Sequence, residues 1–315
     1  MRCPFLREAQ VKYCQGSPIK KMIVRMQNMT VDERCSSSDY VNCPSLKQFH
    51  EEYAQPMRCP FLQESLVQYC SASSVTKYVP YSESSIIPCG KDSHRYCDLF
   101  LSVAATNNVG TAHETVRETM IDNIHLPEGL SYSTNHMWID QSEDGICHIG
   151  VDAFLTRIFR NIDAVNFLPP SNSHLQAVVL TVRGIDLQLV FPLPINVTRV
   201  NSYLRADLQK LILHPYSTGW LYEGTLVDAN SIKSPSPESN MVRGDDAAKW
   251  MKNEVQHLSE FVHNRIIPNQ GAVSPVMMDG GVVQSDFLIH LTKQELFHLF
   301  NEFFSPDNHW RKTDS

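Results

Sequence analysis

Eight of the nine cysteines fall into two sets of four with nearly the same spacing. The sets are Cys3, Cys14, Cys35 and Cys43, and then Cys59, Cys70, Cys89 and Cys97. The intervening residues number 10, 20 and 7 in the first set and 10, 18 and 7 in the second. Four thiolates can close a tetrahedral zinc site, and they can also hold an iron–sulfur cluster. These eight cysteines are therefore the candidate metal ligands.

The residues around the cysteines repeat as well. The hexapeptide Met1–Leu6 recurs as Met57–Leu62, and the pair Tyr13-Cys14 recurs as Tyr69-Cys70. The constant offset of 56 residues indicates a tandem duplication. A unit of about 40 residues usually needs a metal, a disulfide or a partner to be stable. The sequence thus predicts two small cysteine modules.

The identity of the metal is open from the spacing alone. Neither repeat contains the close Cys-x-x-Cys pair that is typical of zinc and iron–sulfur sites. We expect a cytoplasmic protein, in which reduced thiols favour a metal over disulfides. Zinc, with one ion for each set, is the first expectation, and iron–sulfur clusters, redox-active thiols or buried thiols without a ligand are the alternatives. His94, between Cys89 and Cys97, is a further candidate ligand, although the first repeat has no matching histidine.

A short helix is predicted between the first two cysteines of each repeat. Pro4 and Pro60 suit the first turn of a helix. In the second repeat, Phe61, Leu66 and Tyr69 belong to an apolar stripe at helical spacing.

From about residue 126 the pattern changes to short β runs separated by proline and glycine. The runs Leu175–Val182 and Leu187–Phe191 flank a short break with a glycine, which is typical of a β-hairpin. Further β runs cover Cys147–Val151, Ile195–Val200 and Gly219–Val227. Many short strands of this kind indicate a sandwich or a barrel.

Several short, separate segments in this part of the chain resemble the glycine cleavage H protein family. They are Tyr132–Trp138, Gly150–Asp152, Phe167–Pro169, Pro192–Asn201 and Pro215–Leu221. The resemblance extends over about a third of the chain. It implies a small antiparallel barrel-sandwich hybrid, the fold of lipoyl and biotinyl carrier domains.

The resemblance also implies a lysine at the hairpin tip, which carries lipoate in that family. Here the tip holds Arg183 or Gly184, depending on which flanking strand is aligned, and neither can form the lipoyl amide. The only lysine between residues 126 and 230 is Lys210, outside the hairpin. We therefore expect no lipoate and treat Arg183 and Gly184 as a degenerate lipoyl position.

Two helices are predicted near the C-terminal end. The first begins near Asp245, and Trp250, Met251, Leu258 and Phe261 recur along it at helical spacing. The second begins at a capping box of Thr292 and Glu295, and its apolar face consists of Leu296, Leu299, Phe300, Phe303 and Phe304. We expect both apolar faces to be buried within the chain.

Composition and motif searches exclude several classes of function. The chain has 315 residues and a formal net charge of −7, which argues against a nucleic-acid-binding protein. No apolar run reaches the roughly 18 residues of a membrane helix, and the first residues show no secretory signal. Phosphate-binding loops, dinucleotide-binding glycine motifs, nucleophile elbows and paired zinc-protease histidines are all absent from the sequence.

The expected fold class is α+β with several domains. Cysteine modules at 1–50 and 51–100 precede a connector at 101–125, an H-protein-like domain at 126–230, and a linker with a helical tail at 231–315. We expect a non-catalytic adaptor that docks onto protein partners, with redox and one-carbon enzymes as the expected classes. The alternatives are an electron-transfer or redox-sensing protein, and a relative of the glycine cleavage system that acts without the lipoyl arm.

Overall fold

The computed structural model describes ten stretches of the chain, which form two compact units. The units are Met1–His94 and Arg95–Ser315. The described residues are 2–16, 21–23, 34–47, 58–75, 77–79, 88–107, 118–169, 174–228, 241–266 and 287–305. Within these stretches, no helix has both the length and the apolar character that a membrane span needs.

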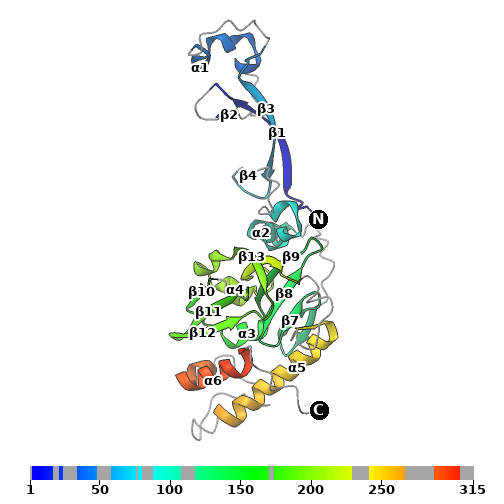
Figure 1. The fold of residues 1–315 in the computed structure, drawn as a ribbon, viewed down its shortest axis with the longest axis vertical. Helices are drawn as coiled ribbons and strands as arrows, with labels where there is room; N and C mark the ends of the chain where they lie inside the picture. The colour runs from blue at the N-terminus through cyan, green and yellow to red at the C-terminus, as the bar shows by residue number, and fades with distance from the viewer. Residues whose placement is uncertain are drawn as a thin grey trace. The chain divides into compact units, whose positions relative to one another are not determined.

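The first unit contains a four-stranded antiparallel sheet in the order β2-β1-β3-β4. Figure 1 shows β1 and β3 as long strands that run side by side. Short helical turns accompany the sheet. The elements are β1 (Leu6–Cys14), β2 (Lys21–Ile23), η1 (Arg34–Ser36), η2 (Ser38–Asn42), α1 (Pro44–Lys47), β3 (Leu62–Cys70), β4 (Lys77–Val79), η3 (Pro88–Gly90) and η4 (Asp92–Tyr96), the last of which crosses the boundary between the units.

The helix predicted between the first two cysteines of each repeat is wrong. Both segments are nine-residue strands, β1 and β3, which pair with each other along their whole length. The pairing runs from Leu6 opposite Cys70 to Cys14 opposite Leu62. Along one edge, each strand therefore takes its backbone hydrogen bonds from a partner in the other repeat, whereas the short strands β2 and β4 pair within their own repeats. Local apolar spacing carries no information about such a distant partner, and strand preference depends strongly on context.

The second unit combines antiparallel sheets with helices. One sheet has six strands in the order β13-β14-β9-β8-β7-β15, another has the order β10-β11-β12, and β5 pairs with β6. Its elements are α2 (Asp98–Asn107), β5 (Glu118–Ile121), β6 (Ile124–Pro127), β7 (Ser131–Ser133), β8 (Met137–Gln141), β9 (Ile146–Val151), α3 (Ala153–Ile158), β10 (Ala164–Phe167), β11 (Ala177–Val182), β12 (Ile185–Val190), β13 (Ile195–Val200), η5 (Ser202–Arg205), α4 (Gln209–Leu213), β14 (Tyr222–Leu226), β15 (Met241–Arg243), α5 (Gly244–Phe261), η6 (Val262–Ile266), η8 (Phe287–His290) and α6 (Lys293–Phe304).

The β runs expected from the sequence are strands in this unit. They correspond to β9, β11, β12, β13 and β14, and β11 and β12 form the expected hairpin. Side chains alternate between buried and more exposed positions along β11, as a strand with one face on a core requires.

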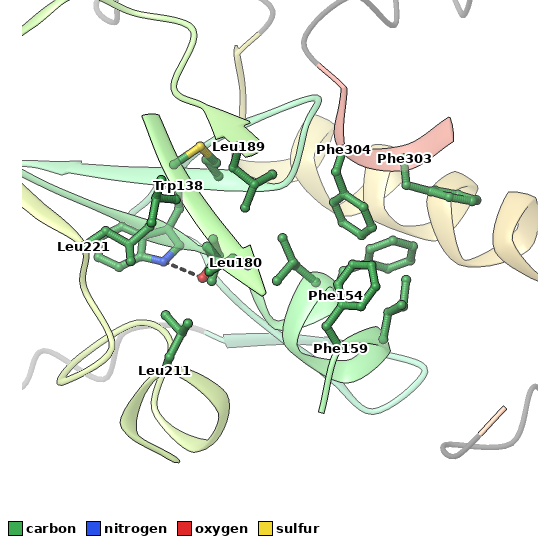
Figure 2. Packing of buried hydrophobic residues seen from close by; sticks show 14 of the residues in the cluster. Trp138, Phe154, Phe159, Leu180, Leu189, Leu211, Leu221, Phe303 and Phe304 are labelled. Carbon is green, nitrogen blue, oxygen red and sulfur yellow. Dashed lines mark hydrogen bonds between the residues drawn. The ribbon is translucent and has the colours of Figure 1, made fainter. Parts of the chain in front are cut away.

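The core of the second unit is built around fully buried aromatic side chains (Figure 2). The Trp138 indole donates a hydrogen bond to the Val151 carbonyl oxygen at 2.9 Å, which satisfies its one polar group. Gly150 lies opposite Trp138 in the β8–β9 pair. A Cβ atom at Gly150 would lie 2.6 Å from the indole ring, so only glycine leaves room for this packing.

Both C-terminal helices pack into this core. Of the linker expected at 229–244, residues 229–240 lie outside the described residues, and Met241–Arg243 is not a loop but strand β15, paired with β7. The capping box at the start of α6 is confirmed, because Glu295 N donates to Thr292 Oγ1 and Thr292 N donates to the Glu295 carboxylate. The apolar face of α6 is buried, as expected, through Leu296, Leu299, Phe300, Phe303 and Phe304.

Candidate functional site

The two repeats are related by an approximate twofold symmetry within the first unit. Gln10 pairs with Leu66, its own equivalent at the offset of 56 residues, at the centre of the β1–β3 ladder. Equivalent hydrogen bonds close the two ends: Gln15 N donates to Phe61 O at 2.9 Å, and Ser71 N donates to Phe5 O at 2.9 Å. The ladder therefore has two chemically similar ends, each with residues from both repeats.

The cysteines gather at these two ends. Cys14 pairs with Leu62 at one end, and Cys70 pairs with Leu6 at the other. Backbone hydrogen bonds then connect the repeats a second time, from Cys59 N to Cys35 O at 2.9 Å and from Cys3 N to Cys89 O at 2.8 Å. Cys3 and Cys59 are buried, and the other six cysteines of the two sets are half-buried.

The thiols at the Cys14 end influence one another electrostatically. Burial raises the pKa of the Cys35 thiol above its usual value, and charge on Cys59, Cys14 and Cys43 raises that pKa further. The Arg34 guanidinium partly opposes this effect. The direction of this shift agrees with the placement of these thiols at one end of the ladder.

The cysteine side chains of the described residues do not form a closed set of metal ligands. Among the described residues, no three His, Cys, Asp or Glu side chains come close enough to hold a metal ion. None of the nine cysteines, all of them described, is in a disulfide. Cys97 lies in the second unit, directly before α2, where its carbonyl oxygen accepts a hydrogen bond from Leu101 N. The His94 ring is held locally, with Nδ1 2.6 Å from the Lys91 carbonyl oxygen.

The second candidate site is the tip of the β11–β12 hairpin. Arg183 and Gly184 are the two turn residues, with φ of 53° and 71°. Positive φ at both positions is what a type I′ turn requires, and this turn matches the twist of paired strands. Gly184 N donates to Asp163 Oδ2 at 3.2 Å. Both tip residues are therefore held by the turn rather than placed on a free arm.

The Arg183 side chain connects the tip to the segment before α6. One guanidinium nitrogen donates to Leu288 O at 2.7 Å and to Leu291 O at 2.6 Å. A pocket of about 160 Å³ lies beside these contacts, lined by Ile158, Arg160, Asn161, Val182, Arg183, Leu288 and Ile289. Lys210 is engaged elsewhere, since its ammonium lies 2.7 Å from the Asp98 carboxylate.

Replacing Arg183 by alanine is expected to loosen the segment 287–305. The variant loses two hydrogen bonds from a charged donor, which should lower the local opening free energy by about 1 to 2 kcal/mol. Hydrogen exchange of the α6 amides measures this effect directly. Arg183→Lys keeps the charge and should restore part of the protection. Unchanged exchange in Arg183→Ala would show that the contact does not hold the segment.

Sequence reasoning missed a buried polar cluster around His136. Its Nδ1 lies 2.8 Å from Asp152 Oδ2, its Nε2 lies 3.5 Å from Glu254 Oε2, and its ring stacks on Phe154. Burial alone would lower the pKa of His136, but Asp152 and Glu254 outweigh that effect and raise the pKa. Asp152 also caps α3 by accepting a hydrogen bond from Leu155 N. The cluster therefore connects the residue before β8 and the N-cap of α3 to α5.

A second buried cluster surrounds Glu223. His148 Nε2 lies 3.0 Å from Glu223 Oε2, and an Arg199 nitrogen lies 2.5 Å from the same oxygen. Burial would raise the pKa of Glu223, but these two partners lower it overall. Tyr96 stacks on the His148 ring with centroids 3.8 Å apart. The sequence offered no reason to assign a role to either histidine. The one available signal was that His136 lies within Tyr132–Trp138, a segment that resembles the H protein family.

Comparison with known proteins supports the resemblance for part of the chain. No protein-family model matches. The chain is 27% identical over 114 residues to the glycine cleavage system H protein of Mycobacterium avium (strain 104), which is 35% of this chain and 85% of that protein. It is 25% identical over 115 residues to the glycine cleavage system H protein of Chromohalobacter salexigens, again 35% of this chain and 86% of that protein. The crystal structure of an H protein from Mycobacterium marinum aligns with a TM-score of 0.33 and 17% identity, over 41% of this chain and 98% of that one. The sequence similarity supports an H-protein-like domain in about a third of the chain.

Proposed function

We propose that the protein is a non-catalytic adaptor with an H-protein-like domain that does not carry lipoate. The eight cysteines of the two repeats would bind metal, with zinc as the expected ion and one ion for each group of thiols. Its partners would be proteins. Because the similar proteins are named for the glycine cleavage system, enzymes of that system and other redox or one-carbon enzymes are the first to test.

The residues at the tip of the β11–β12 hairpin support the proposal that the domain does not carry lipoate. A lipoyl amide needs a primary amine, and the turn offers Arg183 and Gly184 instead. The Arg183 guanidinium is already engaged with two backbone carbonyl oxygens of the C-terminal segment. This contact supports a structural role for Arg183 and leaves the domain as a docking surface.

The thiol chemistry supports the metal. Among the described residues of the unit Met1–His94, the buried apolar side chains are Cys3, Val11, Tyr40, Cys59 and Val79, and a core this small usually needs a metal, a disulfide or a partner in addition. Backbone hydrogen bonds hold Cys59 beside Cys35 and Cys3 beside Cys89, and a divalent cation would bind such neighbouring cysteines as thiolates.

Intact-mass analysis after co-expression with a lipoyl ligase tests the absence of lipoate. An H protein expressed in the same cells provides the positive control. We expect the control to gain the lipoyl mass and this chain to remain unmodified. A lipoylated peptide from this chain would overturn the non-carrier proposal.

Elemental analysis of protein purified without oxygen tests the metal. Zinc without visible absorption supports structural sites. Iron with acid-labile sulfide and visible absorption would replace the adaptor proposal by the electron-transfer alternative.

Titration with purified glycine cleavage enzymes by calorimetry tests the partner class, and the absence of binding to all of them would remove that class.

A further inference from the structure

We propose that each metal site is built from both repeats, because the first cysteine of each repeat belongs to the site of the other. At one end of the ladder the site consists of Cys14, Cys35, Cys43 and Cys59. At the other end Cys3 joins Cys70 and Cys89. This inference rests on the metal binding proposed above, and it changes which thiols share an ion.

The length of β1 separates the first two cysteines of a repeat. Cys3 lies next to the start of this strand, since Leu6 N donates to Cys3 O at 3.1 Å, and Cys14 is its last residue. Eight steps of about 3.3 Å place the two ends of the strand roughly 26 Å apart. Two sulfurs on one zinc ion lie within about 5 Å of each other, because each Zn–S bond is about 2.3 Å. One ion therefore cannot bind both Cys3 and Cys14.

The antiparallel register brings Cys59, instead of Cys3, to the Cys14 end of the ladder. Cys14 faces Leu62, and Leu62 N donates to Cys59 O at 3.1 Å, which brings the first cysteine of the second repeat to the Cys14 end. The twofold symmetry gives the reciprocal result, with Cys70 facing Leu6 beside Cys3.

The third cysteine of each repeat, Cys35 or Cys89, lies beside the first cysteine of the other repeat. Cys59 N donates a hydrogen bond to Cys35 O, and Cys3 N donates one to Cys89 O. At each end of the ladder, the backbone of the first cysteine of one repeat is therefore hydrogen-bonded to that of the third cysteine of the other repeat. The contact occurs twice with nearly the same length, 2.9 and 2.8 Å. Cys43 directly follows η2, which packs against η1, the turn that contains Cys35, and it completes the first end.

Among the described residues, no three His, Cys, Asp or Glu side chains lie close enough to hold a metal ion as they are placed. Binding would therefore require the thiols at each end to change χ1 rotamer toward a common centre. The ninth cysteine does not compete, because burial raises the pKa of the Cys147 thiol to about 12 and keeps it protonated. Its Sγ donates a hydrogen bond to the Gly224 carbonyl oxygen.

Zinc content of paired variants of the full chain distinguishes the two groupings. With two zinc ions in the wild type, Cys35→Ser should keep about one, and Cys35→Ser with Cys59→Ser should also keep about one, since both thiols belong to the same site. Cys3→Ser with Cys35→Ser should keep none. Cys147→Ser is the matched control and should keep two.

The opposite pattern would overturn the exchange. If each repeat held its own ion, the Cys35/Cys59 double variant would lose both ions and the Cys3/Cys35 double variant would keep one. A wild-type protein without any metal would overturn the proposed metal binding instead.

Disulfide mapping of the unmodified chain tests the arrangement without any substitution. After removal of metal with a chelator, diamide oxidises neighbouring thiols to disulfides, and mass spectrometry identifies them. We expect a disulfide that joins Cys59 to Cys14, Cys35 or Cys43. A disulfide between Cys3 and Cys14 would overturn the exchange, and this readout also decides the case in which one substitution releases both ions.

Discussion

Replacing Phe304 by alanine is expected to lower the free energy of unfolding of the second unit by about 4 kcal/mol. The Phe304 side chain is fully buried. Its ring centroid lies 5.3 Å from that of Phe159 and 5.2 Å from that of His136, and Figure 2 shows it directed toward α3. Alanine leaves a cavity that these neighbours can fill only in part. Urea denaturation followed by tryptophan fluorescence measures the loss, because all four tryptophans of the chain lie in Arg95–Ser315.

The same helix offers a matched control. Phe297 lies at the exposed edge of the apolar face of α6, and its side chain is 51% exposed. Phe297→Ala should change the free energy of unfolding by less than about 0.5 kcal/mol. Similar losses in both variants would show that α6 does not pack through the face described here.

Replacing Asp152 by asparagine is expected to lower the free energy of unfolding by about 3 kcal/mol near pH 6. Asparagine can still cap α3, but it removes the carboxylate that lies 2.8 Å from His136 Nδ1, where both side chains are fully buried. A buried ion pair that loses one partner leaves the other charge uncompensated. The exposed pair of Asp246 and Lys249 provides the control, and Asp246→Asn should have almost no effect.

The difference between wild type and Asp152→Asn should depend on pH. The folded protein raises the pKa of His136, so the stability that its protonation contributes is fully present below the ordinary histidine pKa of about 6.5. It is lost as the pH rises through the folded pKa. The gap between the two proteins should therefore shrink from pH 6 toward pH 9. A gap that grows with pH would contradict the charged state assigned to His136.

The sequence predicted local features well where short-range chemistry controls them. The capping box at Thr292 needs only residues three apart, and the hairpin around Arg183 and Gly184 needs only two adjacent β runs and a turn. It also marked the residues that could bind metal, since the repeat itself is visible in the chain.

The histidine clusters show why other parts could not be predicted. His136 meets Asp152 across 16 residues, and Glu254 approaches from α5 more than a hundred residues later. No spacing rule connects positions so far apart. Their pKa shifts depend on burial and on partner distance, which exist only in the folded chain.

By itself, the sequence determined the duplicated cysteine pattern, the β runs of the second unit, the helix start at Thr292 and the absence of a lysine from the β11–β12 hairpin. Only the tertiary structure decided that the repeats pair as antiparallel strands and that Arg183 holds the C-terminal segment. The physical reason is the range of the interactions. Caps and turns depend on neighbouring residues, whereas a strand pair and a buried contact take their free energy from residues that only folding brings together.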